Sequence, residues 1–166
     1  MFQDAFAPPE APNLFPPMLA NEQALLSDLL YQKVNNGVYL AGFATEQGVY
    51  EAAVKELFEV LDQLEDRLSE SRYLLGDRIV ESDWRLFCTL VRFDAVYHGH
   101  FKCNLRRIID YPSLHRHLCE LYRQPGIAET VNLDHIKRHY YITHDDINPN
   151  GIVPVGPAVI FGDDAG

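Results

Sequence analysis

The most constraining feature of the sequence is segment 73–97, YLLGDRIVESDWRLFCTLVRFDAVY, in which a short loop leads into a strongly apolar helical pattern. Two neighbouring apolar stripes recur at helical spacing, one of Trp84, Phe87, Cys88, Val91 and Ala95 and the other of Leu86, Leu90, Phe93 and Tyr97. Only Arg85, Thr89 and Arg92 remain as a narrow polar seam. A helix that is apolar over most of its circumference is usually central in a globular domain, so the other helices are expected to pack around it. Asp83 is expected in its first turn, where unpaired backbone N–H groups favour a carboxylate.

The segments before this helix also show helical spacing. A helix is predicted from about Met18 to Asn35, with Asn35, Asn36 and Gly37 as a stop that tolerates the left-handed conformation. The following segment 38–44, VYLAGFA, is apolar but is expected to be too short for a stable helix. Thr45 is then predicted to cap a long helix that continues to about Ser71.

The segments after the central helix complete an all-α pattern. A turn is expected at 98–104, and a helix is predicted from Pro112 or Ser113 to the residue before Pro125. A short helix from about Ile127 and another from Asp134 to Tyr141 follow. Because no βαβ alternation and no paired alternating strands occur, the predicted fold class is all-α.

The length of 166 residues suits one hydrophobic core with tails. The segment 1–17 is interpreted as an extended linker because five prolines exclude regular structure, namely Pro8, Pro9, Pro12, Pro16 and Pro17. The helical domain is assigned to 18–144. The segment 145–166, rich in Pro and Gly without a helical period, is interpreted as an irregular tail.

The composition limits the partners and the location. A net charge of -10 argues against nucleic acid and against an anionic membrane surface as the main partner. No apolar run is long enough to span a membrane and no secretory signal is present, so a soluble cytoplasmic protein is expected. The odd number of cysteines, Cys88, Cys103 and Cys119, favours free thiols that pack as small apolar side chains.

Few residues form a recognisable chemical motif. The histidines lie in close pairs, such as His98 and His100, His115 and His117, or His135 and His139, but no zinc-binding spacing is complete and no metal is expected. Serine-nucleophile, phosphate-binding and dithiol motifs are absent from the sequence. The acidic residues of the long helix are interpreted as a solvated face, with contact to a partner subunit as the alternative; they are Glu51, Glu56, Glu59, Asp62, Glu65 and Asp66.

Four tyrosines, Tyr39, Tyr97, Tyr140 and Tyr141, lie at the boundaries of predicted elements. A ring at such a position can pack against the core while its hydroxyl faces a pocket. The alternative for each is a packed ring with a satisfied hydroxyl. The residues alone leave both interpretations open.

Several motifs resemble one protein family. NNGVYLAGFA, DWRLF-TLVRFD-VY-GHFKCNL, IIDYPSL and HIKRHYY are similar to the C-terminal helical domain of the glutathionyl-hydroquinone reductases, the xi-class glutathione transferases. The resemblance covers about residues 13–157 and implies a glutathione transferase C-terminal-like helical bundle. It also implies a homodimer and a reaction that converts a glutathionyl-hydroquinone and glutathione to the hydroquinone and glutathione disulfide. In that family a thioredoxin-like N-terminal domain binds glutathione and carries the nucleophilic cysteine.

The resemblance implies roles for the tyrosines and implies that the nucleophilic cysteine lies in another domain. Tyr39 is similar to the residue that exchanges a proton with the hydroquinone oxygen, and Tyr97 and Tyr140 to residues whose hydroxyls point at the nucleophilic sulfur. These three are therefore the predicted catalytic residues, and Tyr39, Tyr140 and Tyr141 are the predicted substrate contacts. None of the three cysteines matches the family's nucleophile, so the chain is expected to be the substrate-site and dimerisation domain, without the thioredoxin-like domain and inactive alone. The alternative is a non-catalytic helical interaction module.

One position departs from the transferase pattern. Glutathione transferases usually place Ser or Thr three residues before the Asp of the central helix, and here that position is Val80. Either Ser82 caps the helix instead, or the helix starts at a different residue.

Overall fold

The computed structural model describes residues 11–158 and 161, which form a helical bundle with one isolated β-bridge, between Tyr73 and Gly76. Its helices are α2 (Ala20–Leu29), α3 (Gly37–Gly42), α4 (Gln47–Glu70), α5 (Glu81–Arg92), α6 (Pro112–Tyr122) and α7 (Leu133–Thr143). Two π-helical segments, Leu30–Asn35 and Phe93–Tyr97, extend α2 and α5. Short 3₁₀ turns lie at Pro17–Leu19, Ile108–Asp110 and Ala128–Thr130. The all-α prediction is therefore confirmed.

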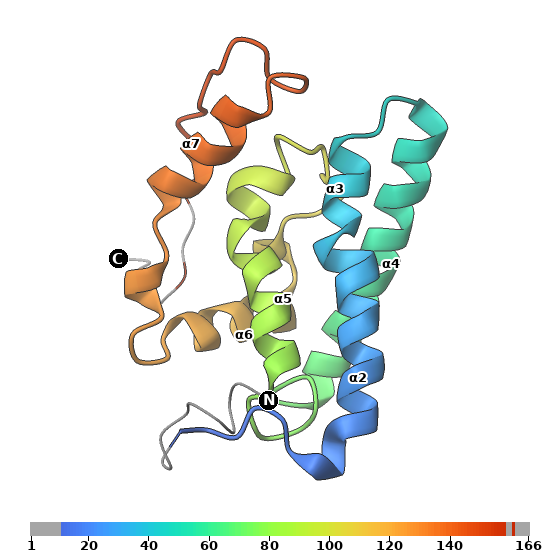
Figure 1. Ribbon diagram of the computed structural model, residues 1–166, viewed down its shortest axis with the longest axis vertical. Helices are drawn as coiled ribbons and strands as arrows, with labels where there is room; N and C mark the ends of the chain where they lie inside the picture. The colour runs from blue at the N-terminus through green and yellow to red at the C-terminus, as the bar shows by residue number, and fades with distance from the viewer. Residues whose placement is uncertain (1–10, 159–160, 162–166) are drawn as a thin grey trace.

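Helix α5 is the centre of the bundle, as its apolar pattern predicts. Figure 1 shows it between α2 to α4 on one side and α6 and α7 on the other, and it contacts both α2 and α6. Leu86, Leu90 and Phe93 are at most 1% exposed, so one stripe is fully buried. Cys88, in the other stripe, is instead exposed.

The loop before α5 is held by Asp83, which occupies the first turn as expected. Its carboxylate accepts the backbone N–H groups of Leu74 at 2.9 Å and Val80 at 2.8 Å. Val80 is the N-cap residue and has no side-chain acceptor, so only the Asp83 half of the capping box exists. Ser82 does not replace it, because its Oγ lies 3.0 Å from Oγ of Ser27.

The structure of the segment between α2 and α4 differs from the prediction in two respects. Asn36 is right-handed, with φ of −84°, and Gly37 begins α3, so no left-handed stop separates the two helices. The prediction that 38–44 is too short for a helix is wrong. Val38 and Ala41 are buried and α3 packs on α4, so tertiary contacts stabilise a helix that would be marginal alone.

Helix α4 matches the long predicted helix to within two residues at each end. Thr45 does not cap it; the N-cap is Glu46, which is extended and makes no side-chain cap bond. Two acidic residues of the face interpreted as solvated also bind other segments of the chain. Glu65 accepts the backbone N–H groups of Ser113 and Leu114 and so caps α6, and Asp62 accepts the hydroxyl of Tyr111.

The remaining segments follow the predictions with one change. The helix expected from Ile127 is the 3₁₀ turn Ala128–Thr130, whereas α7 contains the predicted 134–141. Residues 145–158 have no helix or strand, in line with the irregular tail. The parts of the linker and tail at 1–10, 159–160 and 162–166 lie outside the described residues.

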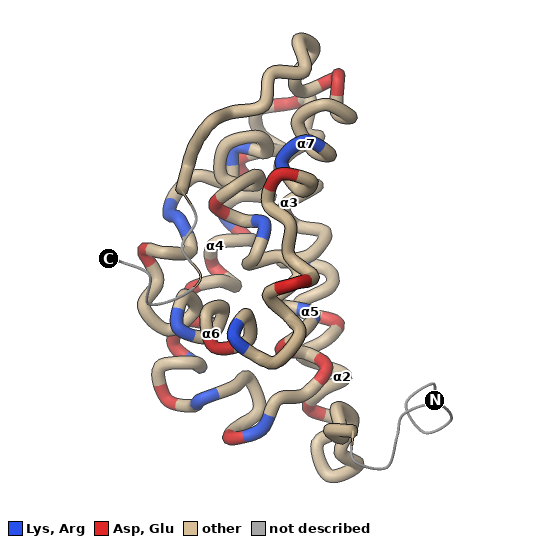
Figure 2. The backbone as a smooth tube through the Cα atoms, turned by 90° about the vertical axis from the view of Figure 1, so that its left-hand side faces the viewer, with Lys and Arg blue, Asp and Glu red and all other residues tan. Residues whose placement is uncertain are grey.

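Figure 2 shows Lys and Arg positions interspersed with Asp and Glu positions along the backbone. Within the described residues, none of the helices is long and apolar enough to cross a membrane. No group of three or more potential metal ligands lies close together in the same part of the chain.

Candidate functional site

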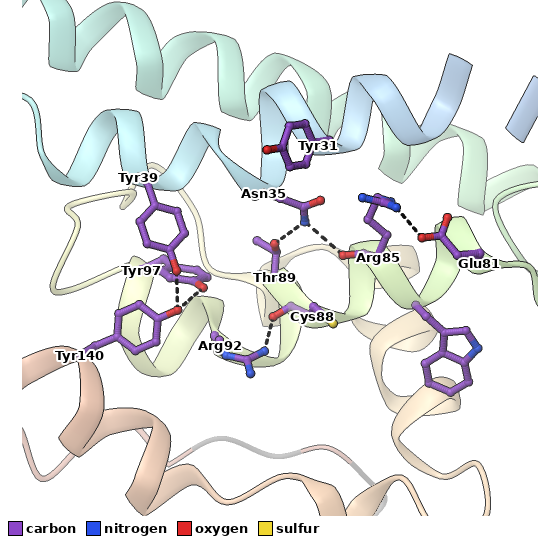
Figure 3. A pocket seen from close by; sticks show the side chains of 11 residues that line it. Tyr31, Asn35, Tyr39, Glu81, Arg85, Cys88, Thr89, Arg92, Tyr97 and Tyr140 are labelled. Carbon is purple, nitrogen blue, oxygen red and sulfur yellow. Dashed lines mark hydrogen bonds and ion pairs between the residues drawn. The ribbon is translucent and has the colours of Figure 1, made fainter. Parts of the chain in front are cut away.

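Three tyrosine hydroxyls from separate elements form one hydrogen-bonded row, which we call the phenol row. The hydroxyl of Tyr140, on α7, lies 2.7 Å from that of Tyr39, on α3, and 2.8 Å from that of Tyr97, at the end of the second π-helical segment. Figure 3 shows the three side chains converging from these elements. The sequence places these residues 43 to 101 positions apart, so only the tertiary fold brings them together.

An aromatic cluster holds the rings of the phenol row. The ring of Phe101 lies 5.4 Å from that of Tyr97 and 5.2 Å from that of Tyr39, measured between centroids. Gly42, the last residue of α3, makes room for it, because a Cβ at that position would lie 2.3 Å from atoms of the Phe101 ring. Such an overlap would force the ring away, so glycine at this position is a condition for the observed packing.

Two of the three tyrosines in the phenol row are buried, and burial raises their pKa values. Tyr97 and Tyr140 are 3% and 7% exposed, whereas Tyr39 is 37% exposed. Burial raises the pKa of Tyr97 far above its ordinary value. Burial also raises the pKa of Tyr140 to about 12, and its hydrogen bond with Tyr39 acts in the same direction, while the charge of Arg92 acts against it.

One hydroxyl hydrogen of the phenol row is not used in the hydrogen bonds within the row. Three hydroxyls carry three hydrogens, and the two bonds of the row use two of them. Either hydroxyl of each pair can be the donor, so the third hydrogen can belong to any of the three tyrosines. On Tyr39, the most exposed member, this hydrogen is available to an acceptor in the neighbouring pocket.

The phenol row ends a pocket of about 630 Å³ that runs along α5. Its wall includes Tyr31 and Asn35 from the first π-helical segment, and Tyr97 from the second. Segments of π-helix inside α-helices are frequent at functional sites. The pocket is lined by Tyr31, Asn35, Tyr39, Glu81, Trp84, Arg85, Cys88, Thr89, Arg92, Tyr97 and Tyr140.

The polar seam of α5 forms the floor of this pocket. Arg85, Thr89 and Arg92 all line it. The amide of Asn35 donates to the backbone carbonyl of Arg85 at 3.1 Å and to Oγ1 of Thr89 at 2.7 Å, which fixes the first π-helical segment against α5. The seam was recognisable in the sequence as a polar stripe on an apolar helix, but nothing in the sequence identified it as part of a site.

Tyr141 lies elsewhere. It is absent from the residues that line this pocket, and its ring packs 4.5 Å from that of His100. His100 in turn forms a hydrogen bond between its Nε2 and Nδ1 of His144, at 3.1 Å. A substrate contact by Tyr141 therefore stays a prediction.

The cysteines divide into two kinds. Cys103 and Cys119 are buried, as expected for packed thiols, and burial raises the pKa of Cys103 to about 12. The same expectation is wrong for Cys88, which is exposed at the pocket because that side of α5 faces the solvent.

The phenol row fits a ligand with a sulfur or oxygen anion. A phenol hydrogen stabilises such an anion by donating to it, and donation to a thiolate lowers the pKa of the thiol. The guanidinium groups of Arg85 and Arg92 suit an anionic ligand such as a carboxylate.

Comparisons with known proteins identify the family of the chain. Residues 47–118 match the family model described as the glutathione S-transferase C-terminal domain. The chain is 58% identical over 129 residues to the glutathionyl-hydroquinone reductase PcpF of Sphingobium chlorophenolicum, covering 78% of this chain and 41% of PcpF. It is 50% identical over 159 residues to the glutathionyl-hydroquinone reductase YqjG of Escherichia coli K12, covering 95% of this chain and 48% of YqjG.

Solved structures give the same result. The glutathione-bound structure of YqjG from Escherichia coli K-12 superposes with a TM-score of 0.92 at 48% identity, over 96% of this chain and 51% of that one. The Xi glutathione transferase of Phanerochaete chrysosporium superposes with a TM-score of 0.90 at 48% identity, over 94% and 54%. The chain thus spans about half the length of these relatives. It is a glutathione S-transferase C-terminal domain, homologous to the glutathionyl-hydroquinone reductases and the Xi-class transferases.

Proposed function

We propose that this chain provides the hydroquinone-binding half of a glutathione-dependent reductase that acts on glutathionyl-hydroquinones. The observation that carries the proposal is the phenol row, because three hydroxyls from separate elements meet at the end of one pocket. A non-catalytic interaction module has no need of such an arrangement. The names of the homologous reductases supply the substrate class.

In the proposed reaction two electrons pass from two sulfur atoms to one ring carbon. The bond between the ring carbon and the glutathionyl sulfur breaks, and that carbon gains a hydrogen. The released sulfur joins the sulfur of a second glutathione as a disulfide, so the sulfurs lose the two electrons that the carbon gains. The nucleophilic thiol and the main glutathione site are proposed to come from a thioredoxin-like domain.

In this proposal the phenol row handles the protons. Tyr39, the most exposed member, exchanges a proton with the hydroquinone oxygen, because its hydroxyl is the one that a ligand in the pocket reaches most readily. Tyr97 and Tyr140 keep their protons to a higher pH, since burial raises the pKa of both. They therefore stay protonated at neutral pH, and the one hydrogen that the row does not use internally can be donated to an attacking sulfur anion.

The test uses a chimera in which this chain replaces the matching segment of YqjG. Tyr140→Phe removes the centre of the row, and we expect glutathionyl-hydroquinone reduction to slow by about 100-fold, a typical contribution of positioned proton transfer. The matched control is Tyr122→Phe, since Tyr122 packs against Phe161 away from the pocket, and its rate should stay near that of the parent. Equal rates in the two variants would contradict the proposed role.

Two further parts of the proposal concern the chain alone. Because its nucleophile is proposed to lie in another domain, the isolated chain should give no turnover with glutathione and a glutathionyl-hydroquinone, and robust turnover would overturn this. We also propose a homodimer formed through the helical domains. Sedimentation that finds only monomer at high concentration would contradict it.

A further inference from the structure

The polar seam carries positive charge that the pocket does not balance. The charged residues lining the pocket are Glu81, Arg85 and Arg92. Glu81 is paired with Arg85, whose Nη2 lies 2.5 Å from its Oε1. The Nη1 of Arg92 donates to the backbone carbonyl of Cys88 at 2.6 Å, and no carboxylate among the described residues forms an ion pair with it. Arg92 therefore presents a net cation to the pocket of a chain whose total charge is -10.

The arginines stand in line with the phenol row. Arg85 and Arg92 are seven residues apart, which places them on the same face of α5 about two turns apart, roughly 10 Å along the axis. Figure 3 shows Arg92 between Tyr140 and Arg85 along this helix. Arg92 and Tyr140 also line the same pocket, and the charge of Arg92 lowers the pKa of Tyr140, an effect smaller than that of burial.

Arg85 has a buried nitrogen atom without a hydrogen-bond partner among the described residues. Its Nε is buried and has no hydrogen-bond partner among the described residues, although one of its terminal nitrogens is paired with Glu81. A buried donor without a partner is costly, and an acceptor brought by a ligand would remove that cost. The seam thus offers two guanidinium groups to a ligand. Arg92 has no ion-pair partner among the described carboxylates, and Arg85 has one nitrogen without a hydrogen-bond partner.

We propose that this polar seam binds a carboxylate carried by the aromatic substrate, either on its ring or on its glutathionyl group, while the ring oxygen meets the phenol row. A guanidinium group matches a carboxylate because its N–H groups form a planar fork that donates two parallel hydrogen bonds. In an acidic protein an anion needs such a local cation to enter a pocket. The inference rests on the proposed function, since it takes the same pocket as the ring site and names the charge of its ligand.

Binding to the intact chain tests the inference without any catalytic step. Trp84 lines the pocket and is the single tryptophan, so its fluorescence, together with titration calorimetry, reports occupation. The probes are 2,5-dihydroxybenzoate, its uncharged methyl ester, and glutathione. All titrations are carried out under anaerobic conditions. We expect the acid to bind about tenfold more tightly than the ester, which corresponds to one charge-assisted hydrogen-bonded contact.

Arg92→Gln should abolish the preference for the acid while leaving the affinity for the ester unchanged. Arg138→Gln is the matched control, because it removes the same charge from α7, where Arg138 pairs with Asp134 outside the pocket. It should keep the preference. A lost preference in both variants would indicate a general charge effect and would overturn the inference.

The same titrations show whether the bound carboxylate belongs to the aromatic ring or to the glutathionyl group. Preference for the acid over the ester, dependent on Arg92, supports a carboxylate on the ring. Competition by glutathione that disappears in Arg92→Gln supports the glutathionyl carboxylates. Equal binding of acid and ester without competition by glutathione overturns the inference but leaves the pocket as the ring site. No binding of any probe overturns the proposed function and the inference with it.

Discussion

Single residues of the site differ in how far sequence could identify them. Tyr39, Tyr97 and Tyr140 were predicted because they lie at the boundaries of predicted elements and match motifs of one family. In the structure Tyr97 does end a helical segment, whereas Tyr39 and Tyr140 lie inside α3 and α7. Their hydrogen bonds were not predictable, because a separation of 43 to 101 residues contains no information on distance. Arg92 was visible only as one polar residue of a seam, and its position beside the phenol row follows from the packing of α7 against the second π-helical segment, Phe93–Tyr97.

The exposure of the cysteines gives a prediction at the residue scale. In the folded chain a thiol reagent such as iodoacetamide should modify Cys88 alone, because Cys103 and Cys119 are buried and burial raises the pKa of Cys103 to about 12. In urea all three cysteines should react. Peptide mass spectrometry identifies the modified positions, and rapid labelling of Cys103 without urea would contradict the packing described.

Single elements follow their patterns in the middle and depart from them at the ends. The apolar period correctly predicts the course of α4 and α5, since burial of one stripe decides where a helix lies. The caps are less predictable. Thr45 can cap a helix, yet Glu46 occupies the N-cap position of α4, and Glu65, near the C-terminal end of α4, caps α6.

The start of α5 gives a prediction at the element scale. In Val80→Thr the new hydroxyl can accept the backbone N–H of Asp83 and complete the capping box, because Val80 already occupies the N-cap position in extended conformation. We expect a gain of about 1 kcal/mol in the free energy of unfolding, which raises the melting temperature by about 2–4 °C.

The control for this variant is Val80→Ala. It also lacks the hydroxyl and removes two buried methyl groups, so its melting temperature should fall. Calorimetry of the three chains separates capping from packing. An unchanged or lower melting temperature for Val80→Thr would contradict the capping argument.

At the scale of the whole molecule, a buried pair joins α5 to α6. His117 Nε2 lies 3.6 Å from Asp83 Oδ1, and both side chains are fully buried. Burial raises the pKa of Asp83 from 3.8 to about 6 and lowers the pKa of His117 from 6.5 to about 4. As pH rises from about 4 to 6, the stability contributed by Asp83 is lost and that contributed by His117 is gained. The two effects offset one another.

Removing one partner should expose the pH dependence of the other. In Asp83→Asn the free energy of unfolding should rise with pH, relative to the parent chain, between about pH 4 and 6.5, because only the unfolded His117 binds a proton there. In His117→Gln it should fall between about pH 4 and 6, because only the folded Asp83 holds a proton there. Urea unfolding at several pH values measures both slopes. Slopes of the same sign would contradict the offsetting pair.

The sequence by itself determined the fold class, the central place of α5 and the family, because helical periodicity and motifs are local properties of the chain. It did not determine that 37–42 forms a helix, since that helix depends on burial against α4. Nor did it determine the pocket, whose lining comes from α3, α5, α7 and two π-helical segments. Hydrogen bonds such as that between Tyr39 and Tyr140 act over less than 3 Å, so only the tertiary structure, which sets distances between remote residues, decides which side chains form a site.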